Sequence, residues 1–413
     1  TVTPSFSLSN PYGSPTSSLQ IKGVGFGAER EIAVSLDAAS IATPSSNAEG
    51  SWSVIVPVPE SPAGDYPITV LSLGGEQEVL FNITPSIVLS ETHGEPGAIL
   101  NLSGFGFAST ERGISVTLDE EPLISGISAD VLGSWNVAFP VPAVSGDTYT
   151  IEASGPETSI ASLPDEIVTI TPSLVVRPAS GVPGSPVSLT GSGFRSQERA
   201  IVISYDGTAV VTGINADASG TFRSSFTVPP SSSGLHFISH SSAITLASGG
   251  SAASFQVVEG ISIDFTEGPP DSGLTVRGSG FTANDPLISI TYDSDRVLVQ
   301  ATSDAQGSFT ESIQIPASTA GTHVIGVRSP NLSSGTNPEQ TFYVVPDVEL
   351  SISSGNVGGR VEVVGLGFGS LAPIVLSYDD ELTETTTVSD VSGSFFVEFP
   401  IPSSVHGDHT IKA

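Results

Sequence analysis

Five copies of one short motif, Gly-x-Gly-Phe, constrain the fold of this chain more than any other feature of its sequence. The copies end at Phe26, Phe107, Phe194, Phe281 and Phe368. The first two are 81 residues apart, and each later copy follows the previous one by 87 residues. A period of this length with strand-like patterning predicts an array of similar β-domains. Such arrays serve length, spacing or contacts within a polymer, because a single active site needs only one scaffold.

The third copy shows the expected strands most clearly. Hydrophobic residues alternate over 201–205, which places Ile201, Ile203 and Tyr205 on one face of a strand. Asp206-Gly207 then indicates a hairpin turn, and a further strand is expected from Phe222 to Val228. About seven short strands with turns every 8–12 residues or so are typical of an immunoglobulin-like sandwich.

Three junctions between copies resemble one another, and three of the four internal junctions carry proline nearby, whereas Val258-Glu259-Gly260 and Val345-Pro346-Asp347 depart from the shared pattern. Val2-Thr3-Pro4-Ser5, Ile83-Thr84-Pro85-Ser86 and Ile170-Thr171-Pro172-Ser173 are variants of one linker. The sequence therefore predicts an all-β fold, a tandem array of five immunoglobulin-like β-sandwich domains. The predicted repeats are 1–83, 84–170, 171–258, 259–345 and 346–413. Short proline-containing linkers favour a semi-rigid rod or crescent.

The fifth repeat lacks its last strand. It ends at Ile411-Lys412-Ala413, where earlier repeats add a strand such as Phe255 to Val258. A sandwich without that strand has an exposed edge. We expect either that the native chain continues beyond Ala413 or that a neighbour donates the strand, and we favour continuation.

Composition limits the partners of this chain. It has 413 residues and a formal net charge of −31 with 12 basic residues, so it should repel nucleic acid and anionic lipid surfaces. The acidity serves either solubility or the binding of divalent cations. Cysteine is absent, which excludes disulfides and cysteine-ligated metals. No apolar run of about 18 residues is present, so we expect no transmembrane segment in this chain.

Acidic clusters follow the same predicted strand in three repeats and are candidate calcium ligands. Calcium takes six to eight oxygen ligands, roughly, and neighbouring residues could supply two or three of them. The alternative is a solvated hairpin tip. The candidate metal ligands are Asp119, Glu120, Glu121, Asp293, Asp295, Asp379, Asp380 and Glu381. Calcium is the one possible cofactor predicted.

A second motif, Asp-x-x-Gly-Ser-aromatic or a close variant, recurs in every repeat, with Asn47 in place of Asp in the first. We interpret it as a turn in which the Asp or Asn caps the backbone two residues on and Gly takes a positive φ. Its copies are 47–52, 130–135, 217–222, 304–309 and 390–395. A calcium role for this Asp is the alternative, which Asn47 weakens.

One repeat position alternates between histidine and tyrosine. His236, His323 and His409 occupy it where the first repeat has Tyr66. This alternation predicts a hydrogen-bonding corner and argues against metal ligation. We find no nucleophile with hydrolase context, and Gly-x-Gly-Phe lacks the third glycine and the helix of a dinucleotide fingerprint. No catalytic residue is predicted, and the chain is not expected to be an enzyme.

Three tripeptides match the N-glycosylation pattern Asn-x-Ser/Thr. The candidate acceptors are Asn82, Asn101 and Asn331, and Pro85 disfavours the first. Such tripeptides are common by chance in a chain rich in Ser and Thr, but they fit an exported surface protein.

The whole chain resembles the tandem immunoglobulin-like repeats of prokaryotic cell-surface proteins, including archaeal surface-layer proteins and bacterial adhesin stalks. The residues that carry the likeness are Gly191–Phe194, Tyr205–Gly207, Asp217–Phe222 and Val228-Pro229, with their equivalents. The resemblance implies an extracellular, structural and often calcium-assisted role, and it identifies no ligand.

The predicted function is therefore structural. We expect an extracellular protein that assembles with copies of itself into a cell-surface lattice or filament, assisted by cations. The alternative is a monomeric adhesin stalk or a carbohydrate-binding array that presents a tip domain. A stalk should remain monomeric, whereas a lattice subunit should assemble.

Overall fold

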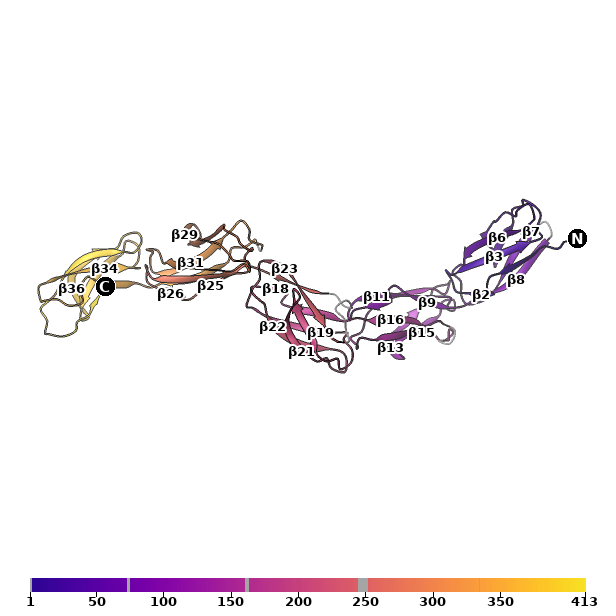
Figure 1. Cartoon of the computed structure of the whole chain (residues 1–413), viewed down its shortest axis with the longest axis horizontal. Coiled ribbons are helices and arrows are strands. Elements are labelled where there is room, and N and C mark those ends of the chain that lie inside the picture. The colour runs from indigo at the N-terminus through magenta and orange to yellow at the C-terminus, as the bar shows by residue number, and fades with distance from the viewer. Residues whose placement is uncertain (1, 73–74, 160–162, 244–251, 334) are drawn as a thin grey trace.

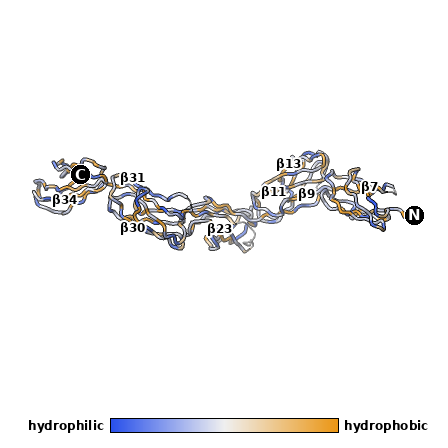
Figure 2. Tube along the Cα trace, turned by 90° about the horizontal axis from the view of Figure 1, so that it is seen from above, coloured by the Kyte–Doolittle hydropathy of each residue, from blue (hydrophilic) through white to orange (hydrophobic). Residues whose placement is uncertain are grey.

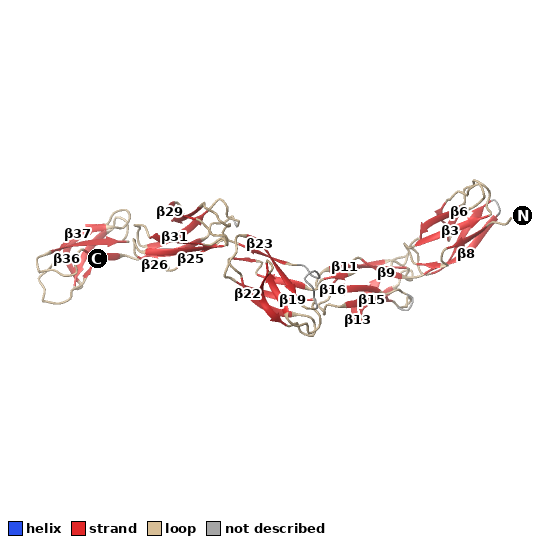
Figure 3. Ribbon diagram, in the orientation of Figure 1, coloured by secondary structure: helices blue, strands red, loops and turns tan. Residues whose placement is uncertain are grey.

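The computed structural model describes residues 2–72, 75–159, 163–243, 252–333 and 335–413, and every regular element in these ranges is a β-strand. Five small sandwiches follow one another along the long axis of the molecule, from the N-terminus to the C-terminus (Figure 1). The ribbon coloured by secondary structure contains strands and loops only (Figure 3). The predicted all-β tandem array of immunoglobulin-like sandwiches is confirmed.

Repeats 1 and 2 have the same order of eight strands. In repeat 1 these are β1 Ser5–Leu8, β2 Tyr12–Gly13, β3 Ser18–Val24, β4 Ala33–Leu36, β5 Ala39–Ala42, β6 Trp52–Pro57, β7 Gly64–Ser72 and β8 Gly75–Ile83. In repeat 2 they are β9 Ser86–Leu89, β10 His93–Gly94, β11 Ile99–Phe105, β12 Arg112–Leu118, β13 Glu121–Ser128, β14 Trp135–Pro140, β15 Thr148–Ser154 and β16 Glu166–Ile170.

Repeats 3 and 4 keep this order, and repeat 5 contains six strands. Repeat 3 has β17 Ser173–Arg177, β18 Ser180–Gly181, β19 Pro186–Ser192, β20 Ile201–Tyr205, β21 Thr208–Ile214, β22 Phe222–Thr227, β23 Gly234–Ser241 and β24 Ala253–Val257. Repeat 4 has β25 Gly260–Ile263, β26 Glu267–Gly268, β27 Gly273–Ser279, β28 Ile288–Tyr292, β29 Arg296–Ala301, β30 Phe309–Gln314, β31 Gly321–Arg328 and β32 Glu339–Val344. Repeat 5 has β33 Asp347–Leu350, β34 Arg360–Leu366, β35 Pro373–Tyr378, β36 Glu381–Val388, β37 Phe395–Pro400 and β38 Ile411–Lys412.

Each of the first four repeats pairs a three-stranded sheet with a five-stranded one. In repeat 3 the order is β17-β19-β22 in the first sheet and β18-β24-β23-β20-β21 in the second. The two-residue strand β18 runs parallel to β24 and pairs Gly181 with Val257, while the other pairs in the sheet are antiparallel. The last strand of a repeat is thus held between two neighbours.

The core of each repeat comes from alternating side chains on both sheets. In β20, Ile201, Ile203 and Tyr205 are all buried, as the alternation predicted. Every repeat has its own cluster of buried side chains, which makes the chain a series of separate cores. Along the trace, hydrophobic and hydrophilic residues accordingly alternate in short segments (Figure 2).

Gly-x-Gly-Phe brings two aromatic rings together at one end of each sandwich. In repeat 3 a Cβ on Gly191 would lie 2.2 Å from the ring of Phe222, so only glycine lets that ring approach the backbone. The Phe194 ring meets the Phe222 ring edge-on at a centroid distance of 5.0 Å. The same edge contact joins Phe26 to Trp52. The motif therefore has a structural role at the end of each sandwich.

The second motif forms the predicted capped turn. The Oδ1 atom of Asp217 accepts hydrogen bonds from the backbone N–H groups of Ser219 and Thr221, both at 2.9 Å. Asn47 Oδ1 accepts the same pair of bonds in repeat 1, and Gly220 has a φ of 73°. Because the Asn47 amide accepts the same two hydrogen bonds as the carboxylates, the turn forms without a charged side chain and does not require a cation.

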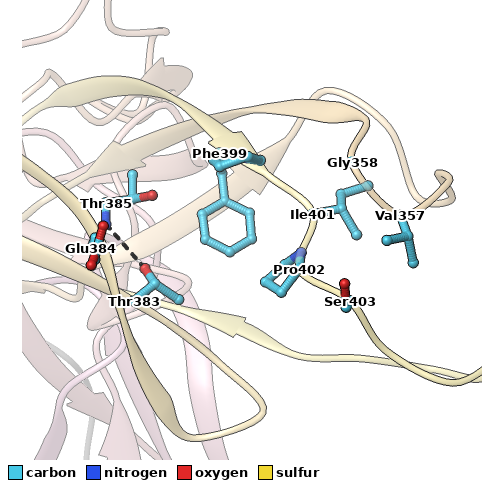
Figure 4. Close-up of a pocket in the computed structure, with 10 residues that line it drawn as sticks. Val357, Gly358, Thr383, Glu384, Thr385, Phe399, Ile401, Pro402 and Ser403 are labelled. Carbon is cyan, nitrogen blue, oxygen red and sulfur yellow. Dashed lines mark hydrogen bonds between the residues drawn. The ribbon is translucent and has the colours of Figure 1, made fainter.

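Repeat 5 is open on one side. Its second sheet has the order β36-β35-β38, without the strand that pairs with the β38 equivalent in the other repeats. Its smaller core is formed by the buried residues Val361, Val363, Ile374, Leu376, Phe395 and Phe399. A hollow lies between β36 and the end of β37, lined by Thr383, Phe399 and Pro402 among others (Figure 4).

Candidate functional site: the junctions between repeats

The most regular feature outside the cores is a hydrogen bond across every junction between repeats. A backbone N–H in the loop before the seventh strand of one repeat donates to a Gly-Phe carbonyl of the next repeat. The bonds are Ala63 to Gly106 O at 3.1 Å, Gly146 to Phe194 O at 2.6 Å, Ser233 to Phe281 O at 3.1 Å and Ala320 to Phe368 O at 3.4 Å. The four junctions therefore share one kind of contact, with the acceptor at the glycine in the first junction and at the phenylalanine in the other three.

The second glycine of Gly-x-Gly-Phe faces the preceding repeat. Gly193 has a φ of 72°, and a side chain there would lie 2.5 Å from the linker carbonyl of Thr171 and 3.0 Å from Cδ of Pro96. Both the dihedral angle and the space require glycine. At the other junctions the corresponding glycine–proline pairs are Gly106 with Pro15, Gly280 with Pro183 and Gly367 with Pro270.

A corner side chain holds each donor loop in place. The Tyr66 hydroxyl donates to Pro62 O at 2.9 Å, and the Tyr149 hydroxyl donates to Ser145 O at 2.8 Å. Each acceptor lies one residue before a junction donor. This contact is the tyrosine corner of immunoglobulin-like sandwiches. Here it fixes the loop that contacts the next repeat.

Histidine takes the corner position in repeats 3 to 5. His236 Nε2 lies 2.9 Å from Ser232 O, and its Nδ1 lies 2.5 Å from Asp206 Oδ2. The imidazole stacks on Tyr205 with ring centroids 5.0 Å apart. His323 and His409 have the same contacts with Asp293 and Thr319 O and with Asp379 and Val405 O. The predicted corner role is confirmed.

The charge on the neighbouring carboxylate acts on the last of these histidines. The hydrogen bond to Asp379 raises the pKa of His409, and the bond to the Val405 carbonyl acts in the same direction. The backbone N–H of Thr410, followed by His409 itself, holds the pKa of Asp379 below its usual range. The pair therefore favours an imidazolium beside a carboxylate.

The predicted calcium ligands lie at hairpin tips. The first acidic residue of each tip accepts a hydrogen bond from the neighbouring strand. In repeat 2, for example, Asp119 Oδ1 accepts a hydrogen bond from the Thr150 N–H at 2.7 Å. Asp295 lies 3.5 Å from Arg328, and Asp380 contacts Lys412. Among the described residues, no group of three or more His, Cys, Asp or Glu is placed to hold a metal ion. The tips are spread over separate repeats, and calcium binding stays a prediction.

The glycosylation candidates differ in their surroundings. Asn101 is exposed on β11. The amide of Asn82 donates to Asp65 at 2.7 Å, and that of Asn331 donates to Asp285 at 3.0 Å. Asn101 and Asn331 are exposed and Asn82 is half-buried, and modification of all three stays a prediction.

Sequence reasoning missed three buried acids that stand four residues after the motif Phe: Glu111, Glu198 and Asp285. Glu111 accepts hydrogen bonds from Glu157 N–H and Thr158 N–H at 2.7 and 2.9 Å and so fixes a long connection between strands. Burial acts to raise the pKa of Glu111, but the hydrogen bonds outweigh it and leave the pKa below its usual value. The constant offset from Phe was the available signal.

A buried histidine was also missed. His240 is 3% exposed, and its ring meets Phe194 edge-on at 4.8 Å. Neither ring nitrogen has a hydrogen-bond partner within the part of the chain that the structure describes. Burial lowers its pKa, while the charges of Glu198 and Glu95 oppose that shift.

No protein-family model and no curated relative matches this chain. Similar solved structures include a bacterial integrin-binding invasin (12% identity, 85% of this chain and 81% of the invasin, TM-score 0.22). The FdeC adhesin of Escherichia coli has 12% identity over 62% of this chain and 98% of its own, with a TM-score of 0.20. An ectodomain fragment of ICAM-5 has 10% identity over 83% of this chain and 100% of its own, with a TM-score of 0.21. Likeness at this level leaves the function to be argued from the chain itself. Within the described ranges there is no helix of the length and hydrophobicity needed to cross a membrane.

Proposed function

We propose that this chain is a structural, non-enzymatic array of a cell surface that holds its two ends apart. The recurrence of one junction at all four boundaries carries this proposal. Each junction combines a backbone hydrogen bond, a glycine–proline contact and a linker of two residues between strands. Proline lies in three of the four linkers, and a short linker together with a fixed contact restricts the angle between neighbours. Such an array acts as a spacer.

Assembly with copies of itself into a lattice or filament is the second candidate. It is favoured by the open sheet edge of repeat 5, since an unpaired edge is a template for pairing with another chain. The net charge of −31 opposes close packing of copies, and calcium at the acidic tips would reduce that repulsion. The third candidate is a monomeric stalk that carries an adhesive or carbohydrate-binding domain.

Light scattering and small-angle X-ray scattering, with calcium and then with a chelator, distinguish these candidates. An elongated monomer in both conditions supports the spacer or stalk. Sheets or fibres that dissolve on chelation support the cation-assisted lattice or filament. A chain that is compact in solution although its repeats are folded contradicts the spacer.

A matched pair of variants tests the calcium ligands in the same assay. Glu120→Gln with Glu121→Gln removes two charges at one acidic tip, where both side chains are exposed. Asp217→Asn with Asp304→Asn removes two charges at capped turns, where Asn47 shows that an amide is accepted. If calcium acts at the tips, only the first pair reduces assembly. An equal reduction in both pairs indicates a general effect of charge.

A further inference from the structure

The corner residues differ in one chemical property along the chain: those of repeats 1 and 2 are phenols, and those of repeats 3 to 5 are imidazoles. In each case the corner side chain bonds to the carbonyl just before the junction donor. Tyr66 holds Pro62, and Ala63 donates to repeat 2. His236 holds Ser232, and Ser233 donates to Phe281 O in repeat 4. The corner therefore anchors the contact with the next repeat.

The partners of His236 define how many protons it carries. The Ser232 carbonyl and the Asp206 carboxylate are both acceptors, at 2.9 Å from Nε2 and 2.5 Å from Nδ1. A neutral imidazole has only one N–H, whereas an imidazolium has two. Both contacts are therefore complete only in the charged form. A tyrosine hydroxyl makes the equivalent bond with the proton that it keeps up to about pH 10.

We propose that His236 is a proton-dependent latch at the junction between repeats 3 and 4, which fixes the angle between them while the imidazole is charged and frees the loop at Ser232 and Ser233 when it is neutral. This inference rests on the proposed spacer function and gives that spacer a joint whose stiffness depends on pH. Asp206 is not among the predicted calcium ligands, so the latch does not involve them.

The surroundings of His236 determine the direction of the effect. The titratable groups that face it are Asp206, at the turn between β20 and β21, and Tyr205, on which it stacks. On its other side β24 places Phe255 opposite it in the sheet. Because the Asp206 carboxylate is a stronger acceptor than a neutral carbonyl, the remaining proton should stay on Nδ1. The Nε2 lone pair then faces the Ser232 oxygen, and two acceptors repel. The joint should loosen as pH rises and the imidazole loses one of its two protons.

The chain offers its own control for a spin-label experiment. It has no cysteine, so labels can be attached at two introduced cysteines without other changes. Ser225→Cys with Ser312→Cys spans the junction between repeats 3 and 4. Ile55→Cys with Ala138→Cys occupies the equivalent strand positions across the junction between repeats 1 and 2, and all four sites are exposed. Pulsed electron resonance then gives the width of each distance distribution.

We expect the width of the distance distribution across repeats 3 and 4 to grow about twofold between about pH 5 and about pH 8.5, because an imidazole can lose its charge within this range. The width across repeats 1 and 2 should not change. His236→Tyr, which installs the corner of repeats 1 and 2, should give a narrow distribution at both pH values. Nitrogen NMR shifts of His236 should show two N–H groups at the lower pH.

Three results would overturn the latch. One is a narrow distribution across repeats 3 and 4 at both pH values, which leaves the spacer function intact. Another is an equal pH response in the wild type and in His236→Tyr. The third is a broad distribution across both junctions at every pH, which would overturn the spacer function together with the latch.

Discussion

Replacing His240 with valine should stabilise repeat 3 and remove part of its sensitivity to acid. The imidazole is buried against Phe194 with both nitrogens unpaired among the described residues. The equivalent positions in repeats 1 and 4 hold Val70 and Val327, which are fully buried. An unsatisfied buried polar group costs about 1–3 kcal/mol, and the smaller valine gives some of that gain back as lost packing. We expect a net gain of about 1 kcal/mol at neutral pH.

The gain should increase as the solution becomes more acidic. Burial, opposed by Glu198 and Glu95, lowers the pKa of His240 in the folded protein. Below about pH 6.5 the unfolded chain therefore binds a proton that the folded chain does not. The free energy of unfolding then decreases as the pH is lowered. The loss reaches about 1.4 kcal/mol per pH unit until the lowered pKa is passed. Valine has no proton to bind, so this dependence disappears.

Repeat 3 can be made to report its own unfolding. The two tryptophans, Trp52 and Trp135, lie in repeats 1 and 2 at the position that Phe222 occupies in repeat 3. In a background with both replaced by phenylalanine, Phe222→Trp confines the fluorescence signal to repeat 3. Urea unfolding at several pH values between about 5 and 7.5 then gives the free energy of unfolding with and without His240→Val.

A transplant provides the control. Val327→His in repeat 4, followed with Phe309→Trp, should add the acid sensitivity of a buried imidazole to this repeat, because Val327 is fully buried. If the wild type and His240→Val lose stability equally as pH falls, the buried imidazole is not the cause and the reasoning is wrong.

Three further outcomes are expected. Gly193→Ala should cost more stability than Gly207→Ala, because both alanines carry strain of about 1–2 kcal/mol at positive φ but only the first meets the Thr171 carbonyl; urea unfolding of each variant measures this. Hydrogen bonds, first from the Thr221 hydroxyl and then from its backbone, lower the pKa of Asp217 to about 2. The stabilisation by this carboxylate should therefore be complete at pH values above the pKa of a carboxyl group in the unfolded chain and be lost as the pH falls through about 2. NMR titration of Asp217 measures the pKa. Extending the chain after Ala413 with a copy of residues 328–345 should raise the unfolding temperature of repeat 5, since that segment ends in the strand that closes repeat 4.

Each of these outcomes has a matched comparison. Asp217→Asn should keep the turn as Asn47 does, whereas Asp217→Ala should lose it, and equal effects would argue against capping. In the extension, replacing Phe342 of the copied strand by serine should abolish the gain, because that ring is buried in repeat 4. A gain that survives this change would show that the added strand does not enter the core.

The spacing of Gly-x-Gly-Phe and the alternation of apolar side chains determined the number of repeats and their sandwich fold. Both signals are local: Gly191 admits the Phe222 ring, and alternation in β20 decides which side chains reach the core. The corner at His236 was predictable for a related reason, since histidine and tyrosine share the ability to donate to a carbonyl.

The tertiary structure decided which residues meet across a junction. Pro96 and Gly193 are far apart in the sequence, and each has an ordinary explanation within its own repeat, so no local pattern pairs them. The burial of His240 likewise depends on Phe194, a residue on another loop. Sequence patterns record what one strand or turn needs, whereas the contact between two folded repeats depends on surfaces that exist only after both have folded.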